Sequence, residues 1–103
     1  MKLKTEERKM IEAGIIDVLK PYVRLSEYKI FFFGSRVNGT SGERSDIDIG
    51  IIGESIDVLK MLEMQEKIKE LKTPYTINLI DFANVGNSFK ETAMKNVDYF
   101  AIL

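Results

Sequence analysis

Apolar residues recur every three or four positions in three stretches of the chain, a spacing that predicts amphipathic helices. The first stretch begins at Thr5 and the second at Ser55; each of these residues is expected to cap its helix, and a proline follows each stretch. The third opens at Ser88, which forms a capping box with Glu91. The inward positions of the second helix are expected to be Val58, Met61, Leu62, Met64, Ile68 and Leu71, and those of the third Phe89, Ala93 and Val97.

Three short segments between the helices have the composition of strands. Residues 30–33 form an apolar, aromatic run that ends at a glycine, and residues 75–82 are rich in β-branched side chains. Residues 46–51 alternate with a period of two, which places aspartates and a glycine on one face and isoleucines on the other. The apolar tail, residues 99–103, is expected to form a small edge strand, to pack on the core or to contact a partner.

This order of elements predicts one small domain of the α/β (α+β) class. A short helix is expected to start at Ser35, and residues 38–45 are the most loop-like segment of the chain. Helices and strands that alternate in this way favour a small mixed sheet with helices packed against it. Since 103 residues are the length of a single domain, residues 1–103 are expected to form one unit.

The composition removes several kinds of chemistry. The chain has neither cysteine nor histidine, which excludes disulfides, thiolate nucleophiles, histidine bases and histidine metal ligands. Its 15 basic and 16 acidic residues give a net charge of −1, so a nucleic-acid partner is not expected. The charged N-terminus and the short apolar runs predict a cytoplasmic protein with no signal peptide and no membrane span.

Two aspartates on the second predicted strand are candidate metal ligands. Asp46 and Asp48 are two residues apart, so their side chains should point the same way, with Cβ atoms roughly 6.5–7 Å apart. Two carboxylates on one face can bridge a pair of Mg²⁺ ions about 3.5–4 Å apart, an arrangement that serves in-line phosphoryl displacement. Asp81, on the next predicted strand, would complete a cradle of three carboxylates. Oxygen ligands without cysteine or histidine favour Mg²⁺ or Mn²⁺ over zinc.

A Gly-Ser turn precedes the acidic strand. Gly34 allows the backbone to approach a ligand closely, and Ser35, at the start of a helix, presents N–H groups and a hydroxyl that suit a phosphate. Phosphate-binding donors beside a metal-binding acidic face indicate a site for a nucleoside triphosphate and its metal ions.

Each of these features also has a simpler interpretation. A D-x-D pair on an exposed strand is in most proteins only solvated, and a Gly-Ser pair after a strand is usually a turn. An aspartate placed like Asp81 commonly caps a helix, and Arg36 and Arg44 would then face solvent. The nucleotide site is favoured because all of these features fall within one strand-turn-strand-helix-strand context.

The spacing G-S-x10-D-x-D, from Gly34 to Asp48, resembles the signature of the DNA polymerase β-like nucleotidyltransferase superfamily. The chain also resembles the minimal nucleotidyltransferase (MNT) branch of this superfamily in its short length, its segments GSRVNG and SDIDIG, and its acidic strand NLIDF. The resemblance implies the polymerase β-like fold and a role for each motif residue. Gly34 and Ser35 would hold the triphosphate, Asp46 and Asp48 would bind two Mg²⁺ ions, and Asp81 would bind the catalytic ion and help to deprotonate the attacking hydroxyl.

The resemblance also implies a reaction and a partner. An acceptor hydroxyl would attack the α-phosphate of ATP, take up AMP and release pyrophosphate. Members of this branch resemble antitoxins paired with HEPN-domain ribonuclease toxins, and some adenylylate a tyrosine of the toxin. Because 103 residues hold little beyond a catalytic core, the acceptor site is expected to be shared with a second copy or with a different protein.

One position departs from the pattern of many relatives. Where they read G-S-R-A-R-G, this chain has Asn38 in place of the second arginine, so Arg36 or Arg44 is expected to supply the cation near the triphosphate. Three alternatives stay open: an antitoxin that neutralises its partner by contact alone, a nucleotidyltransferase with a small-molecule acceptor, and a polynucleotide-tailing enzyme. The near-neutral charge disfavours the last of these.

Overall fold

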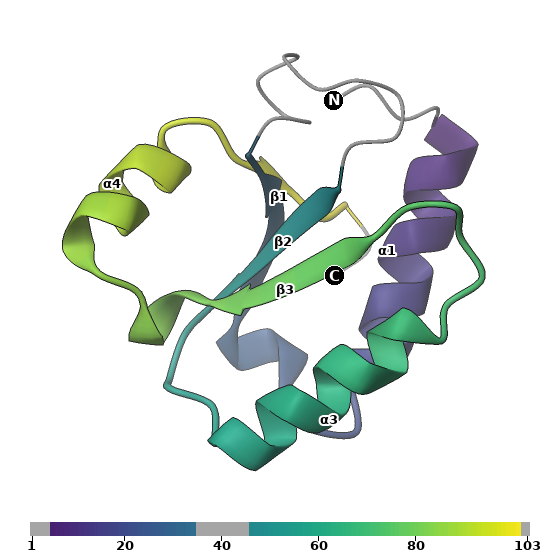
Figure 1. The fold of residues 1–103 in the computed structure, drawn as a ribbon, viewed down its shortest axis with the longest axis horizontal. Helices are drawn as coiled ribbons and strands as arrows, with labels where there is room; N and C mark the ends of the chain where they lie inside the picture. The colour runs from purple at the N-terminus through teal and green to yellow at the C-terminus, as the bar shows by residue number, and fades with distance from the viewer. Residues whose placement is uncertain (1–4, 35–45, 102–103) are drawn as a thin grey trace.

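A computed structural model describes residues 5–34 and 46–101 and shows a mixed α/β arrangement, which confirms the expected fold class (Figure 1). The short helix expected at Ser35 lies outside the described residues. None of the helices in the described ranges is long and apolar enough to cross a membrane. The elements are α1 (Thr5–Leu19), the 3-10 helix η1 (Leu25–Glu27), β1 (Lys29–Phe33), β2 (Ile47–Ile52), α3 (Val58–Lys69), β3 (Ile77–Asp81), the 3-10 helix η2 (Phe82–Asn84), α4 (Asn87–Met94) and β4 (Asp98–Tyr99).

Four strands form one mixed sheet in the order β3-β2-β1-β4. β1 pairs antiparallel with β2 and with β4, whereas β2 pairs parallel with β3. Parallel strands need a crossover connection, and α3 provides it between β2 and β3 (Figure 1). An edge strand forms near the tail as expected, but it is β4, Asp98–Tyr99, and includes only Tyr99 of residues 99–103.

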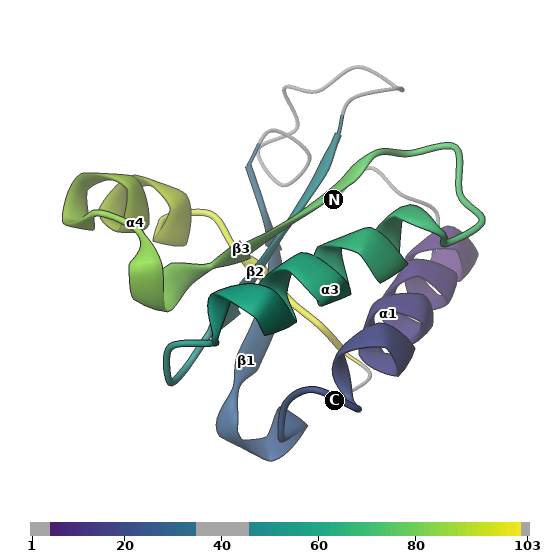
Figure 2. The same cartoon turned by 60° about the horizontal axis from the view of Figure 1, so that its bottom comes forward.

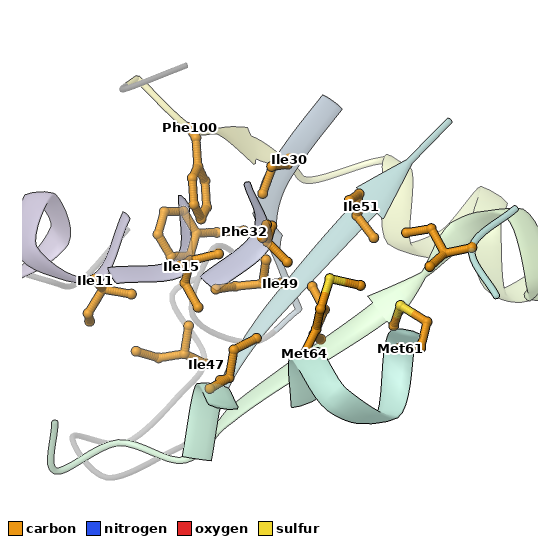
Figure 3. Packing of buried hydrophobic residues seen from close by; sticks show 14 residues of the cluster. Ile11, Ile15, Ile30, Phe32, Ile47, Ile49, Ile51, Met61, Met64 and Phe100 are labelled. Atoms are coloured by element: carbon orange, nitrogen blue, oxygen red, sulfur yellow. The ribbon is translucent and has the colours of Figure 1, made fainter. Parts of the chain in front are cut away.

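The face of the sheet that α1 and α3 cover holds the larger part of the core. Figure 2 shows both helices on the same side of the sheet. Ile47, Ile49 and Ile51 of β2 all point to this side and are fully buried, and Figure 3 shows them in one cluster with Ile15 and Met64. Burial of each isoleucine contributes about 1.5–3 kcal/mol. The alternating isoleucines therefore fix which face of β2 is left for its aspartates.

The opposite face of the sheet is packed with aromatic rings and covered in part by α4. Phe31 and Phe33 pack edge-on against Phe82, with ring centroids 5.0 and 5.1 Å from it. A Cβ at Gly50 would lie 2.5 Å from the ring of Phe31 and 2.6 Å from that of Phe82. Glycine at this position of β2 therefore leaves room for the rings, on the same face of the strand as Asp48.

An ion-pair network joins α1 to the C-terminal segment. The Arg8 guanidinium donates to both carboxylate oxygens of Asp98, at 2.6 and 3.0 Å, and to Glu12 at 3.2 Å. The hydrogen bond to Asp98 raises the pKa of Arg8 above its ordinary value. Glu12 is almost fully buried and also accepts the backbone N–H of Ala101. Together with the buried Phe100, these contacts tie the described part of the tail to the core of the domain itself.

The N-cap residues of two helices differ from the expected ones. Asp57, and not Ser55, caps α3, because its Oδ2 accepts two backbone N–H groups of the first turn at 3.1 and 3.4 Å. α4 begins after Gly86, and among the described residues no side chain caps it, so the capping box expected at Ser88 is wrong. In both cases the cap lies two residues away from the position that the sequence pattern indicated, later for α3 and earlier for α4.

The inward face of α3 is narrower than its apolar pattern suggests. Met61, Met64 and Ile68 are buried as expected, but Val58 and Leu62 are 68% and 52% exposed. One stripe of side chains is enough to cover the sheet beside α1, so the apolar residues on the flank of the helix stay at the surface. Leu62 lines a hollow of the surface beside Asp48.

Candidate active site

The two aspartates of the acidic strand lie together at the start of β2, on the face of the sheet that carries α4. Asp46 is exposed and Asp48 is partly buried. The side-chain amide of Asn78, on β3, donates from Nδ2 to Asp46 Oδ2 at 3.2 Å and to Asp48 Oδ1 at 3.1 Å. The two carboxylates thus share one face, as their spacing predicts, while their metal-binding and catalytic roles stay predictions.

Gly34 follows β1 directly beside Asp48. Phe33 is the partner of Asp48 in the antiparallel pairing of β1 with β2, so the next residue reaches the carboxylate. Gly34 has a φ of +83°, a conformation that residues with a side chain rarely adopt. A Cβ here would lie 2.5 Å from Asp48 Oδ2. Glycine is therefore required both for the turn and for the space that the carboxylate occupies.

Three of the predicted triphosphate ligands, Ser35, Arg36 and Arg44, lie outside the described residues. Their contacts with a nucleotide stay predictions from the sequence. Gly34 is the last described residue before this segment and Asp46 is the first one after it, and both of these flanking residues lie at the candidate site.

Asp81 does not join the other two aspartates, so the expected cradle of three carboxylates is wrong. In the parallel pairing of β2 with β3, Asp48 lies opposite Asn78, and Asp81 lies opposite Ile51, three residues further along. At about 3.3 Å per residue, this is a separation of roughly 10 Å along the strand. The alternation of side chains also turns Asp81 to the other face, the one on which Leu79 packs in the core beside α3.

The carboxylate of Asp81 instead holds three chain segments together. Its Oδ1 accepts the N–H of Ala83, which caps η2, and its Oδ2 accepts the N–H of Ile56 and the side-chain amide of Asn84, each at 3.0 Å. Only 8% of the residue is exposed. The structural interpretation, an aspartate at a strand end that caps a helix, therefore describes Asp81 correctly.

Asn78 is the residue of the site that sequence reasoning missed. It occupies the place where a third carboxylate was expected, and within the described ranges no three acidic, histidine or cysteine side chains are grouped to hold a metal ion. A signal was present in the alternation of INLID, since the buried Leu79 implies that Asn78 faces the opposite side, together with Asp46 and Asp48.

Two hollows in the surface meet at Asp48. The smaller, of about 260 Å³, lies on the side of Gly34 and α4. The larger, of about 540 Å³, extends along β3 and α3 on the side of Asn78. Asp48, Phe33 and Phe89 line both hollows. An in-line displacement needs the leaving group and the attacking group on opposite sides of a phosphorus atom, and two hollows that meet at a carboxylate suit this requirement.

The donor set at this point fits a magnesium-bound nucleotide. Mg²⁺ prefers oxygen ligands and is usually held by one or two carboxylates, with substrate phosphates and water completing its coordination. Asp46 and Asp48 supply two carboxylates, and neither forms a salt bridge with any residue that the structure describes. A divalent cation would therefore offset the charge of both.

Comparisons with known proteins identify the family of this chain. Residues 14–99 match the sequence profile of the family described as "Polymerase beta, Nucleotidyltransferase". A curated relative from Haemophilus influenzae, named "Probable protein adenylyltransferase MntA", is 32% identical over 94 residues, which cover 90% of this chain and 77% of the relative.

Two solved structures share the fold. One is a crystal structure of a toxin-antitoxin with AMP-PNP, with a TM-score of 0.68 and 22% identity over 85% of this chain and 70% of that chain. The other is a tri-AMPylated Shewanella oneidensis HEPN toxin in complex with an MNT antitoxin, with a TM-score of 0.66 and 18% identity over 89% of this chain and 70% of that chain. At these identities the likeness shows the fold alone. The profile match and the Haemophilus relative establish that the chain belongs to the polymerase β nucleotidyltransferase family.

Proposed function

We propose that this protein transfers AMP from ATP to a tyrosine hydroxyl of a HEPN-domain toxin, and so acts as its antitoxin in the cytoplasm. The observation that carries the proposal is the pair of carboxylates, Asp46 and Asp48, on one face beside Gly34. Two comparisons support it: the Haemophilus relative is named as a protein adenylyltransferase, and the fold is shared with an MNT antitoxin bound to a tri-AMPylated HEPN toxin.

The reaction exchanges pyrophosphate for the acceptor oxygen on the α-phosphate of ATP. The bond from the α-phosphorus to the oxygen that bridges to the β-phosphate breaks, the bond to the acceptor oxygen forms, and the hydroxyl proton leaves to solvent or to a carboxylate. Asp46 and Asp48 would hold Mg²⁺, which would supply positive charge against the negative charge of the triphosphate. The hollow beside Gly34 takes the triphosphate. Ser35, Arg36 and Arg44 are the further proposed ligands of the triphosphate.

The acceptor enters from the larger hollow, on the side of Asn78. Two exposed apolar side chains, Leu62 and Phe89, line this hollow and are 52% and 46% exposed. An aromatic acceptor side chain would bury this apolar surface while its hydroxyl points toward Asp48. A tyrosine of the partner therefore suits the hollow better than a small polar molecule does.

An antitoxin that acts by contact alone is the second candidate, and Asn78 is the observation that favours it. A side-chain amide does not accept a proton from an attacking hydroxyl, as a carboxylate can. A chain that binds the toxin but transfers AMP slowly, or not at all, is compatible with an amide at this position.

The proposal is tested with ATP labelled at the α-phosphate, Mg²⁺ and the purified product of the neighbouring gene, for which we expect a HEPN domain. We expect label on the partner, lost in Asp46→Asn and in Asp48→Asn. Asp57→Asn is the matched control, because asparagine also caps helices and Asp57 caps α3 away from the site. Neutralisation of the toxin that survives both site substitutions without label would support the contact-only candidate instead.

A further inference from the structure

The side chain of Asn78 contacts the carboxylates of both Asp46 and Asp48. It is partly buried, lies opposite Asp48 in the parallel pair of strands, and donates to both carboxylates from a single nitrogen, at 3.1 and 3.2 Å. A side chain at this point therefore contacts both carboxylates, and a carboxylate there would be a third candidate ligand for a cation that they share.

We propose that Asn78 limits the site to one Mg²⁺, the ion that arrives with the nucleotide, and that this slows AMP transfer without weakening nucleotide binding. The inference rests on the proposed function and deepens it. Asp46 and Asp48 carry two negative charges, enough to offset one divalent ion. Two divalent ions about 3.5–4 Å apart repel each other strongly and need further negative charge from the protein, and a side-chain amide adds none.

The position of Asn78 relative to the two hollows determines which step is affected. Asn78 lines the larger hollow, on the acceptor side, whereas Gly34 lines only the smaller one. The amide therefore replaces a carboxylate where the acceptor hydroxyl would lose its proton, and it leaves the triphosphate side unchanged. We expect kcat to be low and the KM for ATP to be ordinary.

Among the described residues, no other carboxylate near the larger hollow is suited to take this place. Both oxygens of Asp81 are used by hydrogen bonds on the other face of the sheet. Glu66 lines the hollow, but its Oε1 is paired with Lys69 Nζ at 3.1 Å on the exposed surface of α3.

Counting the metal ions tests the inference directly. Mn²⁺ is titrated into the protein with an ATP analogue whose α,β-bridging oxygen is a methylene group, and the bound ions are counted by electron paramagnetic resonance. We expect one bound ion in the wild type, two in Asn78→Asp and one in Asn78→Ala. Asn87→Asp, which adds the same charge at the exposed start of α4, is the matched control and should bind one.

Two further measurements accompany the count. Asn78→Asp should raise kcat for AMP transfer about 10²-fold, the lower range for a general base, with the KM for ATP unchanged. In the absence of metal, Asn78→Asp should melt at a lower temperature than the wild type, because three carboxylates repel each other. Addition of Mg²⁺ should restore the melting temperature of the variant.

Two bound ions in the wild type would overturn the inference, and that measurement needs no variant. One ion in a folded Asn78→Asp, or an unchanged kcat with two ions, would also overturn it. In each case the proposed function would stand. If neither protein bound the metal and the nucleotide analogue together, the inference and the proposed function would both fail.

Discussion

Replacing Gly34 with alanine adds one methyl group at the point where β1 turns beside the carboxylate of Asp48. The new Cβ would lie 2.5 Å from Asp48 Oδ2, closer than real Cβ atoms approach other atoms. The carboxylate is the free end of a side chain, so it can rotate away. It then gives up the hydrogen bond from Asn78 Nδ2, now 3.1 Å long, and leaves the position in which it could share a cation with Asp46.

The cost of Gly34→Ala has two parts. A residue with a side chain at a φ of +83° costs about 1–2 kcal/mol in backbone conformation. Loss of the hydrogen bond to Asp48 adds about 1 kcal/mol or less, since this carboxylate is partly solvated. A loss of about 2 kcal/mol lowers the melting temperature of a domain of this size by roughly 8–16 °C.

Thermal unfolding and nucleotide titration together test this reasoning. We expect Gly34→Ala to melt lower by this amount and to bind the Mg²⁺ complex of a non-hydrolysable ATP analogue at least about tenfold more weakly, which corresponds to the loss of one ligand interaction of about 1.4 kcal/mol. Gly86→Ala is the matched control, because its φ is −69° and nothing lies within 4 Å of the added Cβ. A Gly34→Ala protein with the melting temperature and nucleotide affinity of the wild type would refute the argument.

Three other substitutions have defined outcomes. Gly50→Ala should lower the free energy of unfolding in urea by about 1–3 kcal/mol, because its Cβ would meet the two phenyl rings; an unchanged value would show that the rings have room to move. Arg8→Met should cost about 3 kcal/mol in the same assay, since it leaves the buried Glu12 without its cation, and adding Glu12→Gln should recover part of the loss; no recovery would count against a charge effect. Leu62→Ser should raise the KM for the partner protein at an unchanged melting temperature, because Leu62 is half exposed and lines the larger hollow. Val58→Ser, on the same helix, should change neither quantity. Equal effects of the two substitutions would show that Leu62 does not contact the acceptor.

The placement of Asp46 and Asp48 could be predicted because burial and alternation act together on β2. Each second residue is an isoleucine that loses about 1.5–3 kcal/mol if it is turned to solvent, so the intervening residues have one orientation open to them. The close approach at Gly34 followed from similar local reasoning, since only glycine adopts its backbone conformation readily.

The third member of the site could not be predicted in the same way. Which residue of β3 lies opposite Asp48 depends on the register of a parallel pair, and strands joined by a long crossover have no tight turn to fix that register. Both Asn78 and Asp81 fall within the predicted strand, and the preference for a carboxylate selected the wrong one. The helix caps failed for a related reason: Ser55 and Asp57 both suit a cap, so residue type alone does not distinguish them, and α3 starts after Asp57.

Calorimetric titration of the Mg²⁺ complex of the α,β-methylene analogue of ATP tests the central claim most directly. We expect saturable binding to one site per chain, lost when the metal is chelated and at least about tenfold weaker in Asp48→Asn than in Asp57→Asn. If the wild type released no heat, or if both variants bound the nucleotide equally well, the paired aspartates beside Gly34 would not be a nucleotide site.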